Sequence, residues 1–143
     1  MLYMGSFDEV ELLRRRAYEF FRHAQDALSH REFDLACFFA EQAAQLRAKS
    51  PIPRTHGLRE LLELILKALQ DLLKGEKIMY IRESLERERQ WLRTLEEAYT
   101  IARYGLRTYD PEEARHCVDL AKTLIELLDN IEEKVFSNER SRN

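Results

Sequence analysis

FDLACFFAEQAAQLRAK, residues 33–49, is the stretch that decides the fold. Its alanines recur every three or four residues, which is the spacing of one helix face. These are Ala36, Ala40, Ala43 and Ala44. Small side chains let a neighbouring helix approach closely, so we expect this face in the core. A second stripe combines an aromatic ring with hydrogen-bonding groups, and it consists of Phe38, Gln42, Gln45 and Lys49. Two faces of different chemistry imply two neighbours and predict a helical bundle.

The composition agrees with an all-α protein. The chain has 143 residues, of which 45% are hydrophobic, and it contains only four glycines and three prolines. This length suits a single domain over residues 1–143, and the scarcity of turn residues disfavours an all-β fold. The formal net charge of −3 gives no general attraction to nucleic acid or to an anionic membrane.

Capping and breaking residues divide the chain into about five antiparallel helices. The first two form a hairpin, because the break between them, Ser29-His30-Arg31-Glu32, is short. The fourth is expected to end at Gly105, and Asp110 with Pro111 marks the start of the last. The polar tail, residues 136–143, is expected to fray. The predicted helices span residues 6–29, 33–50, 57–74, about 76–104 and 111–136.

The third predicted helix is apolar over more than half of its circumference. Leucine and isoleucine occupy most positions between Leu58 and Leu73. A helix of this kind is buried on two sides, which in a small chain predicts a subunit interface and hence a homodimer. Cys37 and Cys117 fall on apolar helix faces, and we interpret them as reduced core residues rather than as a disulfide.

Several classes of site have no pattern in this sequence. Neither the four histidines nor the two cysteines have metal-ligand spacing, and no glycine-rich phosphate loop is present. We therefore predict no metal and no cofactor. No segment has the length and apolarity of a membrane span, and the N-terminus does not resemble a signal peptide, so we predict a cytoplasmic protein.

Three segments, taken in order, resemble the HEPN family of small prokaryotic helical domains over essentially the whole chain. They are the helix FDLACFFAEQAAQLRAK, the loop PRTHGLREL that follows it, and AYTIARYG followed by DPEEARHCVDLAKTLIELL. The resemblance implies a bundle of about five helices that forms a homodimer. It also implies a domain proposed to bind nucleotides, often paired with a minimal nucleotidyltransferase in a toxin–antitoxin-like system.

One branch of that family cleaves RNA with an arginine that is followed closely by a histidine. Here Arg103 is followed by Tyr104, Gly105 and four more residues without a histidine. Arg16 and His23 satisfy the spacing formally and share one helix face, but we interpret this as coincidence. An enzyme is therefore disfavoured, and RNA is an expected partner only if the ribonuclease alternative holds.

The nucleotide hypothesis names six candidate binding residues. Arg103 would pair with phosphate, and Tyr104 or Tyr99 would stack on a base. His56 and Arg54 in the proline-rich loop would add donors, and Gln42 would read a base edge. Each has a structural alternative, such as a helix cap for Arg103, a helix-bridging amide for Gln42 or a core aromatic for Tyr99.

The function expected from the sequence is a non-catalytic nucleotide-binding or partner-binding subunit. A ribonuclease toxin is one alternative, and RNA cleavage that is lost on His23→Ala or His56→Ala would identify it. A purely structural helical adaptor is the other, and it would bind no nucleotide.

Overall fold

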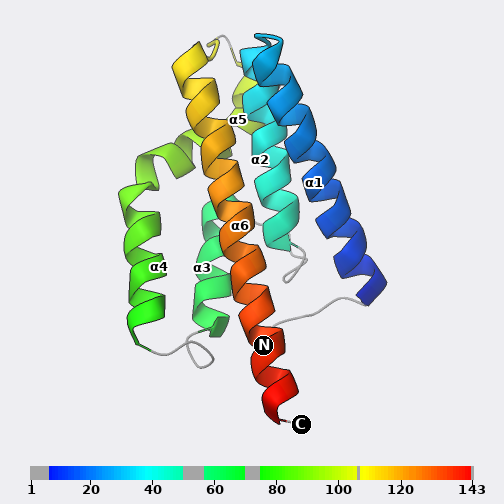
Figure 1. Cartoon of the computed structure of the whole chain (residues 1–143). Coiled ribbons are helices and arrows are strands. Elements are labelled where there is room, and N and C mark those ends of the chain that lie inside the picture. Colours follow the sequence, from blue (N-terminus) through cyan, green and yellow to red (C-terminus); the bar gives the residue numbers. More distant parts are fainter. Residues whose placement is uncertain (1–6, 50–56, 70–74, 106, 143) are drawn as a thin grey trace.

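The computed structural model describes residues 7–49, 57–69, 75–105 and 107–142, and all regular structure in these ranges is α-helical (Figure 1). Some side chains inside these ranges lie outside the description, including those of Tyr99 and Arg103 and those of residues 134–142. The helices are α1 (Phe7–Ser29), α2 (Phe33–Lys49), α3 (Leu58–Leu69), α4 (Glu76–Arg87), α5 (Arg89–Tyr104) and α6 (Pro111–Arg142). The all-α prediction is confirmed.

The alanine-rich helix α2 lies at the centre of the bundle, where it packs against α1, α3, α5 and α6. All four alanines of the predicted face are buried. Because these side chains are small, their helix has room for several neighbours. In Figure 1, α1 and α6 flank α2 along most of its length. The residues that carry chemistry on α2 therefore face other helices rather than open solvent.

A tight turn joins α1 to α2 and makes the predicted hairpin. Arg31 has a left-handed backbone conformation with φ of 60°, and its guanidinium lies 5.3 Å from the centre of the Phe33 ring. The backbone N–H of Glu32 donates to the carbonyl of Ala27 at 2.9 Å, which closes the end of α1.

Helix α3 buries its apolar residues inside this chain. Leu58, Leu61, Leu62, Ile65 and Leu66 are all buried without a second subunit. Helix α4 supplies part of the cover, because it packs against α3 and α5 through its own buried Ile78 and Ile81. The described part of α3 thus gives no support to a subunit interface at this helix, and the homodimer stays a prediction.

The single helix expected over about 76–104 is two helices, α4 and α5, separated at Glu88. Neither glycine nor proline marks this break. The bend turns Ile78 and Ile81 toward α3, while Leu92 and Leu95 of α5 lie in the core near α2. Just after the break, the Trp91 ring stacks on the His116 ring of α6 with 3.8 Å between centres. The bend thus follows from the packing of α4 on α3 and of α5 on α2, and not from a helix-breaking residue.

Helix α6 begins where the sequence predicted. The backbone N–H of Glu113 donates to the Asp110 carboxylate at 2.7 Å, and the backbone N–H of Asp110 donates to the Glu113 carboxylate at 3.3 Å. This reciprocal capping box fixes the first turn. The helix ends at Arg142, later than the predicted end near residue 136, and its last turns extend beyond the other helices in Figure 1.

Candidate functional site

The structure describes the side chains of only some of the six predicted site residues. Gln42 is half-buried on α2, and Tyr104, at the end of α5, is 72% exposed. Arg54 and His56 lie outside the described residues. Tyr99 and Arg103 belong to α5, but their side chains are not among those described. Gln42 is therefore the residue from which the site can be built.

The Gln42 side chain forms a hydrogen bond with the buried carboxyl group of Glu41. Its side-chain amide Nε2 donates to Glu41 Oε2 at 2.8 Å. Glu41 has no exposed surface, and no described residue donates to its second oxygen, Oε1. A buried acceptor without a donor is costly, because the group has lost its hydration without replacement. This oxygen is an unusual feature on a helix face that consists mostly of alanines.

Burial raises the pKa of Glu41 to about 7, because the protein interior disfavours the charged carboxylate. The hydrogen bond from Gln42, the charge of Lys49 and a hydrogen bond from Gln45 act in the opposite direction, and the nearby charge of Glu96 raises the pKa further. Glu41 thus changes protonation state near neutral pH, as a functional carboxyl often does.

Glu96 of α5 joins this group to the start of α3. Its carboxylate accepts from Arg59 Nε at 2.6 Å, and this pair is partly exposed. A Cβ placed on Gly57 would lie 2.2 Å from Glu96 Oε1, so a larger residue there would displace the carboxylate. Gly57 directly follows the proline-rich segment that contains Arg54 and His56. The α2–α3–α5 junction, defined as Glu41, Gln42, Gly57, Arg59 and Glu96, therefore lies beside the end of that segment.

Helix α5 extends the junction along its length. Tyr99 and Arg103 follow Glu96 by three and seven residues, which are positions on one side of a helix. Seven residues of helix span about 10 Å. Tyr104 follows Glu96 by eight residues, which is also a spacing found within one helix stripe. Tyr99, Arg103 and Tyr104 therefore share helix α5 with Glu96, and the side chains of Tyr99 and Arg103 are not among those described.

The junction brings together three kinds of polar group. It has a half-buried amide, a carboxyl group that titrates near neutrality and an arginine–carboxylate pair. The one strongly perturbed acid is fully buried. Amides and carboxylates recognise N–H and C=O edges, and arginine binds phosphate or carboxylate.

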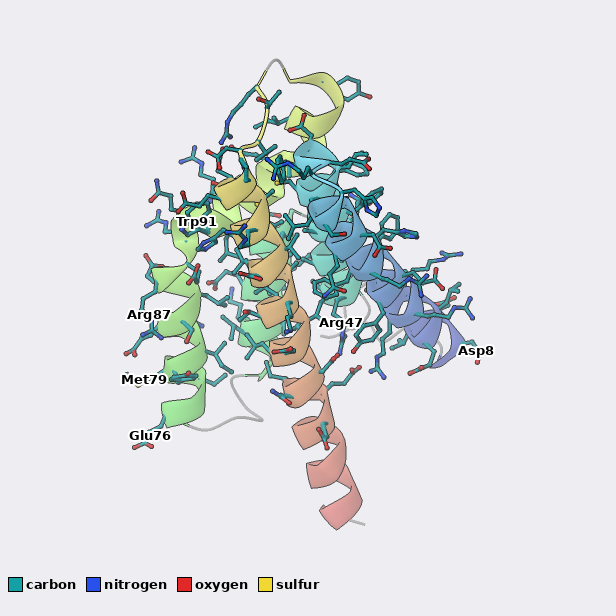
Figure 2. The ribbon with its side chains drawn as sticks, turned by 45° about the horizontal axis from the view of Figure 1, so that its top comes forward. Asp8, Arg47, Glu76, Met79, Arg87 and Trp91 are labelled. Carbon is teal, nitrogen blue, oxygen red and sulfur yellow. The ribbon has the colours of Figure 1, made fainter. Side chains whose placement is uncertain are left out.

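A second polar cluster lies lower on α2, around Arg47, which is labelled in Figure 2. Arg47 is only 1% exposed, and it donates from Nε to Asp129 at 2.8 Å and from Nη2 to Glu132 at 2.6 Å. Arg14 of α1 also binds Glu132, and the Tyr18 hydroxyl donates to Asp129. These five residues form the Arg47 cluster, which joins α1, α2 and α6 through paired charges.

An open groove of about 790 Å³ follows α1 beside the Arg47 cluster, and Arg14 and Tyr18 belong to both. The ionisable carboxylates and guanidinium groups in its lining are equal in number. They are Asp8, Glu11 and Glu19 against Arg14, Arg15 and Arg22. A lining with balanced charge does not favour an anionic ligand, so the groove is a weaker candidate than the junction.

Sequence reasoning missed both buried charges on α2. Glu41 lies four residues after Cys37, and Arg47 lies three after Ala44, so each falls on the small-residue face that was predicted to be core. Asp129 and Glu132 likewise continue the spacing of the buried α6 residues Ile125 and Leu128. The signal that could have found them is a charged residue at core spacing, matched by an opposite charge on another helix.

The arginine–histidine pair of the ribonuclease alternative lies on α1. Arg16 and His23 are both exposed, and the His23 ring lies 5.8 Å from the Phe39 ring centre. Within the described part of the chain, no three residues of the His, Cys, Asp and Glu types form a group that would hold a metal. No helix described here is both long and apolar enough to cross a membrane.

Comparison with known proteins gives one family match. The family model of the HEPN domain matches residues 10–131. A search of curated proteins and a search of solved structures found no match. The matched range contains all of α2, α3, α4 and α5, and therefore every residue of the junction.

Proposed function

Since the chain belongs to the HEPN family, whose domain model covers most of its length, we propose that it is a non-catalytic subunit that binds a nucleotide at the α2–α3–α5 junction. Its proposed protein partner is a minimal nucleotidyltransferase, in a toxin–antitoxin-like pair. The observation that carries the proposal is the half-buried Gln42 amide, which is held by the buried Glu41 beside the end of the Pro-Arg-Thr-His segment.

Each part of a nucleotide has a suitable group near the junction. The amide of Gln42 retains one N–H and its carbonyl oxygen for a base edge, because only one of its N–H groups is given to Glu41. Arg103 is the proposed phosphate ligand, with Arg54 and His56 as further donors and Tyr99 or Tyr104 as the stacking ring.

The absence of a family catalytic pair supports a binding role. Arg103 is followed by no histidine before Pro111. The formally spaced pair, Arg16 and His23, is on α1, which does not belong to the junction.

A thermal-shift screen against nucleoside mono-, di- and triphosphates tests the proposal. A ligand at a hundred times its dissociation constant stabilises the folded state by about 2.7 kcal/mol, which raises the Tm of a domain of this size by several degrees. We expect at least one nucleotide to do so, with calorimetry confirming the binding.

Matched variants locate the site. Arg103→Ala and Gln42→Ala should each weaken binding at least tenfold. Arg93→Ala, on the same helix and in an exposed pair with Glu97 at 3.4 Å, should leave binding unchanged, as should Gln25→Ala on α1. If no nucleotide binds, the nucleotide proposal fails, and copurification with a coexpressed minimal nucleotidyltransferase then tests the partner role separately.

A further inference from the structure

The Gln42 amide is bound at one end by a fully buried neighbour. Its nitrogen, Nε2, donates to Glu41 Oε2 at 2.8 Å. Glu41 has no exposed surface, whereas Gln42 is half-buried. The donor and the acceptor of an amide lie on opposite sides of its carbon atom, so the Gln42 carbonyl oxygen points away from the Glu41 carboxyl group. The group that Gln42 offers to a ligand is therefore an acceptor, with one N–H beside it.

The charge of Glu41 decides which end of the amide faces it. An ionised carboxylate only accepts hydrogen bonds, so the amide nitrogen must face it. A protonated carboxyl group has one O–H, and Oε1 has no hydrogen-bond partner among the described residues. A proton on Oε2 finds an acceptor if the Gln42 amide turns over and presents its carbonyl oxygen. Because buried unpaired donors are rarer than buried unpaired oxygens, we expect protonation to reverse the amide.

Burial has the largest effect on the charge of Glu41. It raises the pKa of Glu41 to about 7, so both forms are present near neutral pH. Lys49 on the same helix favours the charged form, and Glu96 of α5, which is paired with Arg59 of α3 at 2.6 Å, disfavours it. The Arg47 cluster supplies paired charges of α1 and α6 next to α2, six positions farther along the helix. Small changes in pH near 7 therefore change the charge of Glu41.

The two orientations of the amide match different nucleobases. Adenine and cytosine present an amino group next to a ring nitrogen that accepts a hydrogen bond, whereas guanine and uracil present a carbonyl oxygen next to a ring N–H. With its carbonyl outward, the Gln42 amide accepts from the amino group, and its N–H donates to the ring nitrogen. The reversed amide pairs with a carbonyl oxygen and a ring N–H instead. The charged form of Glu41 therefore favours the amino bases.

We propose, in extension of the nucleotide function on which this inference rests, that Glu41 is a positioning residue that holds the Gln42 carbonyl outward, so that the junction selects nucleotides of adenine or cytosine over those of guanine or uracil. Glu41 acts only through its neighbour, so its buried carboxyl group does not need to touch the ligand. Protonation of Glu41 turns the amide over and removes the preference.

The side-chain amide of Gln42 can be followed without a ligand. Its two N–H signals are identified in a nitrogen–proton correlation spectrum of the full-length chain as the pair that disappears in Gln42→Ala. We expect them to shift between pH 5.5 and pH 8.5 with a midpoint near 7, and to stay fixed in Glu41→Gln. Gln25, exposed on α1, should not respond. Gln42 signals that do not move in the wild type, or that move equally in Glu41→Gln, would overturn the proposal.

Calorimetry with CTP and UTP tests the base preference. The two nucleotides share their sugar and triphosphate, and their bases differ only in the edge that Gln42 would read. At pH 8 the wild type should bind CTP about fivefold more tightly than UTP, because a mismatched base edge typically weakens binding by this factor or more. At pH 6, where most Glu41 is protonated, the preference should be lost or reversed. The triphosphate titrates equally in both ligands, so its effect cancels in the ratio of affinities.

Two variants complete the test. Glutamine at position 41 can donate or accept, so Glu41→Gln should bind CTP and UTP with similar affinity at both pH values. Glu86→Gln, exposed on α4, loses one negative charge elsewhere and should keep the wild-type preference. Equal binding of CTP and UTP by the wild type at pH 8, or a preference that Glu41→Gln retains, would overturn the role of Glu41 and leave the nucleotide site in place. If no nucleotide binds, the proposed function fails and the base preference fails with it, whereas the spectra still decide whether Glu41 positions Gln42.

Discussion

Arg47 and Glu41 are two buried charged residues six positions apart on the same helix, and the bundle treats them in opposite ways. Arg47 receives two carboxylates from α6 and is shared with α1 through the common partner Glu132. Glu41 receives amide hydrogen bonds, has one oxygen without a partner among the described residues, and lies near a second acid, Glu96.

The difference separates a structural role from a candidate functional one. The charges of the Arg47 cluster neutralise one another and join three helices, so this cluster offers little for a ligand to bind. A buried carboxyl group without a counterion lowers the stability of the fold. Proteins tend to retain such a group where it has a function. The contrast therefore places the binding proposal at Glu41 and Gln42, and it assigns the Arg47 cluster to the stability of the fold.

Arg47→Met should give the largest effect. It removes the buried guanidinium that pairs with Asp129 and Glu132, and only Glu132 keeps a positive partner, Arg14, so we expect a loss of about 3 kcal/mol of unfolding free energy. Chemical denaturation followed by circular dichroism measures this. Adding Asp129→Asn and Glu132→Gln to Arg47→Met should recover much of the loss, because the uncompensated charges are then gone.

Arg15→Met is the matched control on the surface. Arg15 and Glu19 form an exposed pair at 3.8 Å, which should contribute less than about 0.5 kcal/mol. A similar loss in Arg15→Met and Arg47→Met would remove the structural role assigned to the cluster.

Glu41→Gln should give the next largest effect on the free energy of unfolding. Above neutral pH this substitution should stabilise the protein, whereas Arg47→Met destabilises it. The folded pKa of Glu41 is about 7, above its ordinary 4.5, so the stability due to proton binding is complete below pH 4.5 and is lost as the pH rises through 7. The wild type should therefore lose up to about 3 kcal/mol, relative to the glutamine variant, between pH 4.5 and pH 8.

Denaturation midpoints at pH 5, 6, 7 and 8 measure this difference. Glu86→Gln, exposed on α4, controls for the loss of one negative charge. A difference between wild type and Glu41→Gln that stays constant with pH would contradict the proposed titration of Glu41.

Apart from the surface control, Tyr18→Phe should give the smallest effect, because it removes a partly exposed hydrogen bond to Asp129 while the Arg47 pairs remain. We expect a loss below about 1 kcal/mol near pH 7. Burial, and then the hydrogen bond to Asp129, raise the pKa of Tyr18 to about 12. Its contribution is therefore complete below pH 10 and is lost as the pH rises through 12. An ultraviolet titration of the two proteins isolates this group, and a loss comparable to that of Arg47→Met would contradict the ranking.

Local patterns were enough to predict most of the fold. The alanine face of α2, the capping box at Asp110 and the buried α6 stripe from Ala114 to Ile131 each depend on residues within one helix. The bend at Glu88 could not be predicted in this way. It depends on what α4 covers on α3, and no local breaker marks it.

The candidate site was less accessible to sequence reasoning than the fold. Gln42 was predicted because it belongs to a visible stripe, whereas Glu41 and Arg47 were missed because a charge at core spacing is informative only when its partner on another helix is known. The register between two helices cannot be predicted from the sequence of either helix alone.

The partners of Arg47 also have a consequence for biosynthesis. Asp129 and Glu132 follow it by 82 and 85 residues, so the ribosome makes the arginine long before its carboxylates. The α1–α2 hairpin can form early from neighbouring segments, but it cannot bury the guanidinium favourably at that stage. The nascent chain must keep this end of the hairpin hydrated until α6 emerges. Completion of the bundle therefore waits for the synthesis of α6, and a chain truncated before Asp129 would lack the charges that close it.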